Sequence, residues 1–150
     1  MANSLIYLAA DHGGFEYKNK LVDFLQENNF DVEDLGPAAL NPQDDYPDYA
    51  FALAEKVAGN PETLGIMFCR GGQGMAIAAN KVKDVRAVVC WDKQGAADSK
   101  NDNDANVLSL PANHLSWKET QDIILVWLNT PYSAEERHVR RIQKISDYEQ

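Results

Sequence analysis

Blocks of apolar and polar positions alternate along the chain and predict strands and helices in turn. Residues 5–10 form a continuous apolar run, which is typical of a parallel strand buried on both faces. Residues 15–26 place their apolar side chains at roughly helical spacing, which predicts a helix. The same patterns predict four further strands, at residues 31–35, 64–69, 86–91 and 107–110.

Local signals mark the starts of the later helices. Pro47 suits the first turn of a helix, where its missing N–H costs nothing. Ser116 and Glu119 have the spacing of a capping box, and the apolar positions that follow them predict an inward-facing stripe. Helices are expected at residues 47–57, at 75–81, after Ser116, and at 134–147.

This alternation predicts an α/β protein. We expect a single domain over residues 1–150 with a three-layer α/β/α, Rossmann-like architecture and a five-stranded parallel sheet. In such sheets ligands bind beyond the carboxyl ends of the strands, near the point where the strand order reverses. Side chains that directly follow a predicted strand are therefore the candidates for chemistry.

The run from Cys69 to Gly74 is the most informative candidate, because it joins a strand to a helix with three glycines in four positions. Glycine lets the backbone approach a ligand closely, and free N–H groups at a helix start can bind an anion. Cys69 is expected where the strand meets solvent, and a thiol near a helix N-terminus can act as a base or nucleophile. The alternative is a tight turn with a small apolar cysteine. The spacing matches neither the dinucleotide-binding fingerprint nor the phosphate-binding P-loop.

Two polar segments are also expected beyond strand ends. Asp11 and His12 follow the first strand, where a carboxylate and an imidazole suggest acid–base chemistry. A helix cap beside a surface imidazole is the alternative. Residues 100–106 are rich in Asn and Asp and are expected after the fourth strand, with turn formation as the alternative.

The predicted C-terminal helix is basic, although the chain as a whole is acidic. Arg137, Arg141 and Lys144 share one helical face, and the arginine fork suits phosphate. The alternative is a solvated basic face that pairs with neighbouring acids such as Glu135 and Glu136.

Composition excludes several classes of function. A net charge of −9 argues against a general nucleic-acid or membrane surface. No stretch approaches the roughly 18 apolar residues of a membrane span, and no signal peptide is expected at the N-terminus. Cys69 and Cys90 make no disulfide framework, so a cytoplasmic protein is expected, with Cys90 serving packing. The three histidines lack a metal-ligand spacing, so no metal is expected.

In their order and spacing these segments resemble the ribose-5-phosphate isomerase B and galactose-6-phosphate isomerase family over nearly the whole chain. Each motif is weak by itself, whereas the ordered set is specific. The motifs that carry the resemblance are Ala10-Asp11-His12-Gly13-Gly14, Asp45-Tyr46-Pro47-Asp48-Tyr49-Ala50, Cys69 with Gly72 and Gly74, Ala78-Ala79-Asn80-Lys81-Val82, Asn103-Asp104-Ala105-Asn106 and Arg137-His138-Val139-Arg140-Arg141.

The resemblance implies an aldose–ketose isomerase of a phosphorylated sugar, with no metal or organic cofactor. It implies that Cys69 is the base that moves a proton between C1 and C2 through an enediolate. The N–H groups of the loop would then stabilise the developing oxyanion. It also implies a homodimer, or a dimer of dimers, with sites shared between subunits and the helix at 134–147 packed on the partner. The residues with implied substrate contacts are Asp11, Tyr46 and Asn103 at sugar hydroxyls, His12, Arg137 and Arg141 at the phosphate, Gly71, Gly72 and Gly74 at the oxyanion, and Arg70, Gln73, Asn113 and His138 elsewhere in the site.

The chain departs from the family pattern at three of these positions. Gly71 stands where the family has threonine, Asp102 where it has the histidine assigned to ring opening, and Asn113 where it has a substrate-facing arginine. These changes predict a substrate other than ribose 5-phosphate, such as a shorter or open-chain sugar phosphate, with Asp11 and Asp102 as acid–base candidates beside Cys69. Two alternatives remain open: an inactive sugar-phosphate-binding relative with a regulatory role, and a different reaction on the same scaffold.

Overall fold

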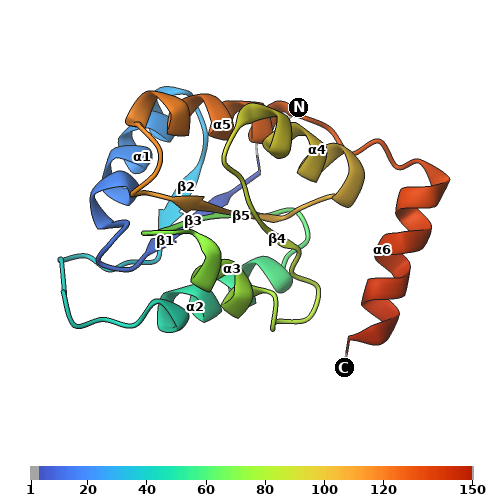
Figure 1. The fold of residues 1–150 in the computed structure, drawn as a ribbon, viewed down its shortest axis with the longest axis horizontal. Helices are drawn as coiled ribbons and strands as arrows, with labels where there is room; N and C mark the ends of the chain where they lie inside the picture. The colour runs from blue at the N-terminus through green and yellow to red at the C-terminus, as the bar shows by residue number, and fades with distance from the viewer. Residues whose placement is uncertain (1–3, 150) are drawn as a thin grey trace.

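One five-stranded parallel sheet runs through the molecule, and helices cover both of its faces (Figure 1). The computed structural model describes residues 4–149, so residues 1–3 and 150 of the predicted domain lie outside the described part. The predicted three-layer α/β/α fold is confirmed. The strands are β1 (Ile6–Ala10), β2 (Val32–Asp34), β3 (Leu64–Cys69), β4 (Ala87–Val89) and β5 (Val107–Pro111).

Each face of the sheet has its own hydrophobic core, because side chains alternate between the two faces of a strand. Along β1, Ile6 and Leu8 pack on one face with α1 and α5, whereas Tyr7 and Ala9 pack on the other with α2 and α3. The helices of the first face are α1 (Phe15–Glu27), α4 (Lys93–Asn103) and α5 (Trp117–Asn129), and those of the second are α2 (Tyr46–Ala58) and α3 (Gln73–Ala79) (Figure 1).

The strand order is β2-β1-β3-β5-β4. Strand β2 lies on one side of β1, whereas β3, β5 and β4 lie on the other, so the strand order reverses between β1 and β3. Crossovers to either side of this point leave a crevice beyond the carboxyl ends of these two strands, where ligands bind in sheets of this kind. Asp11 directly follows β1, and Cys69 is the last residue of β3. Both residues therefore lie at the carboxyl ends of the two strands that flank the reversal point.

The sequence patterns did not predict helix α4, and residues 100–106 were placed at the wrong end of the sheet. Asp92 caps α4 by accepting the N–H of Gly95 (2.7 Å), but only Ala96 and Ser99 of this polar helix are buried, so it has almost no apolar stripe. The helix carries the chain from the carboxyl edge back to the amino edge of the sheet. Residues 100–106 therefore precede β5 instead of lying beyond β4.

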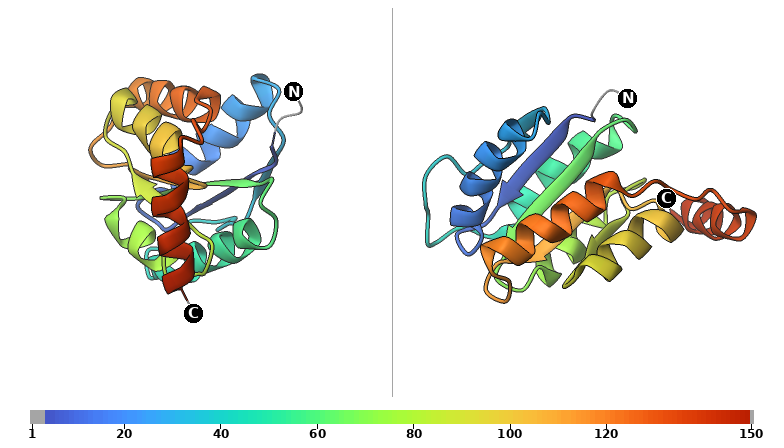
Figure 2. Two further views of the ribbon diagram at one scale, coloured as in Figure 1. Left: turned by 90° about the vertical axis from the view of Figure 1, so that its right-hand side faces the viewer. Right: turned by 90° about the horizontal axis from the view of Figure 1, so that it is seen from above.

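Helix α6 (Glu136–Tyr148) stands away from the body of the molecule, as Figures 1 and 2 show. Within the described residues His138 is its one buried side chain, whereas Val139, Ile145 and Tyr148 are exposed. An amphipathic helix gains most of its stability by burying its apolar face. Helix α6 does not bury that face against its own chain.

The described part of the chain holds no helix with the length and apolar character that a membrane crossing requires.

Candidate active site

Cys69 lies inside the protein and not, as its sequence position suggested, where the strand meets solvent. Only 6% of the residue is exposed, and it belongs to the core between the sheet and helices α2 and α3. The backbone N–H of Gly72 donates a hydrogen bond to its Sγ at 3.2 Å. The sulfur is therefore held against the backbone of the loop that follows it.

The loop after Cys69 is held in a conformation that needs glycine. Gly72 has φ +73°, and a Cβ there would stand 3.1 Å from the backbone of Leu110 and Pro111. The buried hydroxyl of Ser109, on β5, donates to the Gly72 carbonyl and fixes the turn. No acceptor within residues 4–149 takes the N–H groups of residues 71, 73 and 74, so these donors are available to a ligand.

Asp11 sits beside this loop. Its backbone N–H donates to the carbonyl of Phe68 (3.3 Å), and a Cβ on Gly14 would stand within 2.6 Å of the Phe68 backbone, so only glycine allows this close approach. Burial raises the pKa of Asp11, while the Gly13 N–H on its Oδ1 (2.9 Å) lowers it in part. The carboxyl group therefore keeps its proton to a higher pH than an ordinary aspartate.

His12 pairs with a carboxylate from a distant loop. Its Nδ1 lies 2.7 Å from Oδ1 of Asp44, which also accepts the His12 backbone N–H at 3.1 Å. Ligand-type atoms of Asp11, His12 and Asp44 lie within 4.8 Å of one another. The 2.7 Å contact between Nδ1 of His12 and Oδ1 of Asp44 is that of a carboxylate–imidazole pair.

Two further predicted residues, Tyr46 and Asn113, reach the same place. Tyr46 lies in the first turn of α2, and its ring packs directly against Gly74. A Cβ added to Gly74 would stand within 3.1 Å of the ring carbons and hydroxyl oxygen of Tyr46. The N–H of Asn113 donates to the carbonyl of Arg70 at 3.1 Å, which ties the segment after β5 to the loop. We call the residues gathered at these strand ends the Cys69 cluster: Asp11, His12, Tyr46, Cys69, residues 70–74 and Asn113.

The remaining predicted residues form a second group, the Arg137 cluster: Asp102, Asn103, Arg137, His138 and Arg141. Asp102 and Asn103 end helix α4, and the other three lie on α6. Nε2 of His138 lies 3.5 Å from Oδ1 of Asp102, and Arg137 pairs with Glu135 at 3.2 Å. The side chain of Arg137 is 59% exposed, and Arg141 is exposed.

The two clusters lie at opposite ends of the sheet. The Asn103 carbonyl accepts from Arg86, the residue before β4, and the Asn106 carbonyl accepts from Gly65 near the start of β3. The six residues of β3, at about 3.3 Å each, place its two ends roughly 16 Å apart. A single chain therefore does not bring Cys69 and Arg137 into one site.

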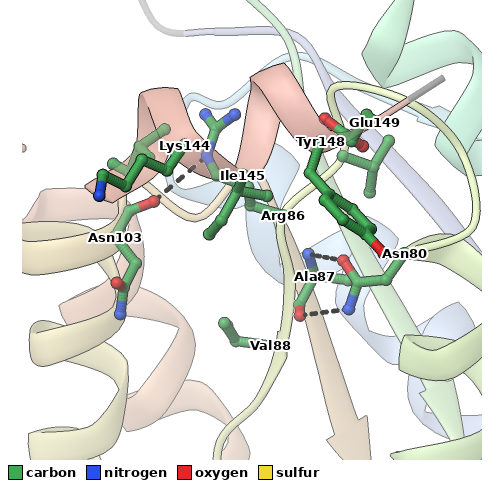
Figure 3. A pocket seen from close by; sticks show the side chains of 11 residues that line it. Asn80, Arg86, Ala87, Val88, Asn103, Lys144, Ile145, Tyr148 and Glu149 are labelled. Atoms are coloured by element: carbon green, nitrogen blue, oxygen red, sulfur yellow. Dashed lines mark hydrogen bonds between the residues drawn. The ribbon is translucent and has the colours of Figure 1, made fainter. Parts of the chain in front are cut away.

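A large cavity borders the Arg137 cluster and not the Cys69 cluster. It has a volume of about 620 Å³ and lies between α6 and the edge of the sheet at β4. Figure 3 shows Lys144, Ile145 and Tyr148 of α6 lining it together with Val88 and Asn103. Part of its apolar lining comes from α6, at Ile142, Ile145 and Tyr148.

Comparison with known proteins identifies this arrangement. The chain matches the family model described as ribose/galactose isomerase over residues 6–145. The chain belongs to the ribose/galactose isomerase family. It is 41% identical, over 98% of its length and 96% of the relative's, to a probable ribose-5-phosphate isomerase B of Mycoplasma pneumoniae, and 33% identical to ribose-5-phosphate isomerase B of Mycobacterium tuberculosis, over 99% and 92%.

Solved structures agree with the family assignment. The crystal structure of ribose-5-phosphate isomerase B from Mycoplasma genitalium with bound ribulose 5-phosphate has a TM-score of 0.95 to this fold, with 38% identity over 99% of this chain and 98% of that one. The Thermotoga maritima enzyme has a TM-score of 0.91, with 35% identity over 96% and 98%. Membership of the ribose/galactose isomerase family makes this protein an aldose–ketose isomerase of sugar phosphates.

Two residues at the Cys69 cluster escaped the sequence reasoning. The sequence patterns place Ser109 inside a predicted strand and single out neither its hydroxyl nor the carboxylate of Asp44. Asp44 and His12 lie 32 positions apart, and Ser109 and Gly72 lie 37 apart, so no local pattern links them. A polar residue in a buried strand was the one available signal for Ser109.

The two cysteines are predicted to differ in reactivity, because a thiolate and not a thiol reacts with alkylating agents. Burial raises the pKa of Cys90 to about 11, so this residue stays a thiol at pH 8 and reacts only as the pH approaches that value. Iodoacetamide at pH 8, followed by peptide mass spectrometry, should label Cys69 first, and Cys69→Ala should abolish the early labelling. Equal labelling of both residues at pH 8 would contradict this assignment.

Proposed function

We propose that this isomerase works through an enediolate, with Cys69 as the proton-transfer base, and that its substrate is a sugar phosphate other than ribose 5-phosphate. The observation that carries the catalytic part is the contact of Sγ with a backbone donor at the reversal point of the sheet. Unpaired N–H groups follow directly along the loop. A base and an oxyanion site are thus neighbours, as enolisation requires.

The proposed reaction begins with an open-chain aldose phosphate. The Cys69 thiolate removes the proton from C2, the C–H electron pair forms the C1–C2 double bond, and the negative charge passes to O1. The N–H groups of Gly71, Gln73 and Gly74 stabilise this charge, while the Gly72 N–H holds the sulfur. Return of the proton to C1, with loss of the O2 proton, gives the ketose. The raised pKa of Asp11 suits it to carry the proton between the two oxygens.

We propose that the phosphate is bound by Arg137 and Arg141 of a second subunit. The separation of the two clusters within one chain supports this arrangement, because the arginines of the same subunit lie at the far end of the sheet. The uncovered apolar face of α6 supports it too, since a partner surface would bury Val139, Ile145 and Tyr148. In a two-fold symmetric dimer, each α6 would reach the Cys69 cluster of the other subunit.

The substrate assignment rests on Asp102 and Asn113. Opening a sugar ring requires a group that both gives and takes a proton near neutral pH, which an imidazole does and an exposed carboxylate does poorly. The Asp102 side chain is 41% exposed and accepts a hydrogen bond from Asn101 at 2.8 Å. Asn113 brings no charge to the Cys69 cluster. A shorter or open-chain sugar phosphate needs no ring opening and fits these changes.

Replacing Cys69 tests the base. Cys69→Ala should lower kcat by about 10³-fold because the proton acceptor is lost, while substrate affinity changes little. Steady-state kinetics and calorimetric binding of the substrate would measure the two effects. Cys90→Ala is the matched control and should keep turnover. Near-native kcat in Cys69→Ala would show that another group is the base.

Replacing Arg141 tests the phosphate site. Arg141→Ala should raise KM for the phosphorylated sugar roughly tenfold or more, since a charge-assisted contact contributes about 1.5–3 kcal/mol. Its neighbour Arg140 is also exposed, so Arg140→Ala controls for the loss of one positive charge from α6. Binding of an unphosphorylated analogue should be unaffected. Equal losses for both ligands would argue that Arg141 acts on the fold and not on the phosphate.

A substrate panel tests the choice of sugar. Erythrose 4-phosphate should be turned over with a higher kcat/KM than ribose 5-phosphate in a coupled assay. Asp102→His should raise activity on ribose 5-phosphate, because it restores a group that can open the ring. A clear preference of the natural protein for ribose 5-phosphate would refute the substrate assignment and leave the proposed base untouched.

A further inference from the structure

Asp44 places a charged group in the interior beside the proposed site. It lies in the loop before α2, yet its side chain is only 4% exposed. Its Oδ1 accepts the backbone N–H of His12 (3.1 Å) and lies 2.7 Å from the imidazole Nδ1. Its Oδ2 is buried and has no hydrogen-bond partner within residues 4–149. Burying a carboxylate in this way is costly unless a cation balances it.

His12 is the basic side chain that lies against Asp44. Burial raises the pKa of both Asp11 and Tyr49, and the charge of Asp44 raises both further. Both neighbours are acids, so neither can neutralise a carboxylate. Within residues 4–149 the one ion pair that Asp44 makes is with His12, whose side chain is 27% exposed and so remains accessible from the crevice.

We propose that Asp44 is a positioning residue for His12. Its carboxylate fixes the imidazole with the Nδ1 proton directed at Asp44, so that Nε2 is the nitrogen offered to the substrate. It also stabilises the imidazolium form, which then donates a charge-assisted hydrogen bond to the substrate phosphate. The nitrogen of a histidine that faces a ligand is set by the partner of the other nitrogen.

This inference rests on the proposed function in one respect, the assignment of the phosphate to His12. It also explains how the Cys69 cluster binds a phosphate without the arginine that Asn113 replaces. An imidazolium held by a buried carboxylate supplies a positive charge on this side of the site. A neutral imidazole would offer only an ordinary, weaker hydrogen bond.

The test removes the charge and keeps the shape. Asp44→Asn retains an acceptor for the His12 backbone N–H but cannot balance an imidazolium. Asp45→Asn is the matched control, because Asp45 is the next residue, is exposed, and makes no side-chain cap to α2. Long-range nitrogen–proton NMR spectra at pH 7.5 would report the protonation of each ring nitrogen, with His12→Gln used to assign the signals.

In the natural protein and in Asp45→Asn, we expect both ring nitrogens of His12 to carry a proton, with Nδ1–H directed at Asp44 and Nε2–H responding to added inorganic phosphate. In Asp44→Asn the neutral Nε2–H form should appear, the apparent Kd for inorganic phosphate should rise, and KM for the sugar phosphate should rise roughly tenfold with kcat within about threefold.

Unchanged His12 spectra in Asp44→Asn would overturn the proposal whatever happens to activity. A changed tautomer with unchanged KM and unchanged phosphate affinity would overturn its substrate part. If the natural protein isomerised no sugar phosphate, the proposed function would fail, yet the tautomer and the inorganic phosphate titration would still decide the role of Asp44.

Discussion

The polarity of the parallel sheet is the constraint on which the rest of the structure depends. Every strand ends at the same edge, so the residues after β1, β3 and β5 must gather there, and Asp11, Cys69 and Asn113 do so. Every connecting helix returns the chain to the opposite edge, so the residues before a strand must gather at the other end. Asn103 precedes β5, and for this reason it lies apart from Cys69 within the chain.

Close packing of backbone on backbone fixes the positions of the loops in the Cys69 cluster. Gly14 lets the loop after β1 touch the backbone of β3, and Gly72 lets the next loop turn back so that its N–H meets Sγ of Cys69. Ser109 holds that turn from the neighbouring strand. The contacts to Sγ and to the Ser109 hydroxyl fix the turn at Gly72, so the donors of the loop are oriented before any ligand arrives. Preorganised donors of this kind are the main electrostatic device of enzymes that stabilise an oxyanion.

Much of the fold could be predicted because the hydrophobic pattern determines it. The apolar runs of β1 and β3 and the capping box of α5 have local signatures, and each was found at its expected position within a few residues. Helix α4 was missed because it buries almost nothing, so it has no periodic pattern. The sequence predicted which residues are candidates for the site, but not how they are arranged in space. Only tertiary structure reveals that Asp102 and Asp11 lie at opposite ends of the sheet, or that Asp44 meets His12.

The most direct test of a site shared between subunits is complementation between two inactive variants. One variant carries Cys69→Ala, and the other carries Arg137→Ala with Arg141→Ala. Each homodimer should be nearly inactive at low substrate concentration. When the two are unfolded together and refolded, half of the dimers are mixed, and each mixed dimer has one intact site. The mixture should therefore recover about a quarter of natural activity in a two-fold symmetric dimer. No recovery, with mixed dimers present by mass spectrometry, would contradict a site built from both subunits.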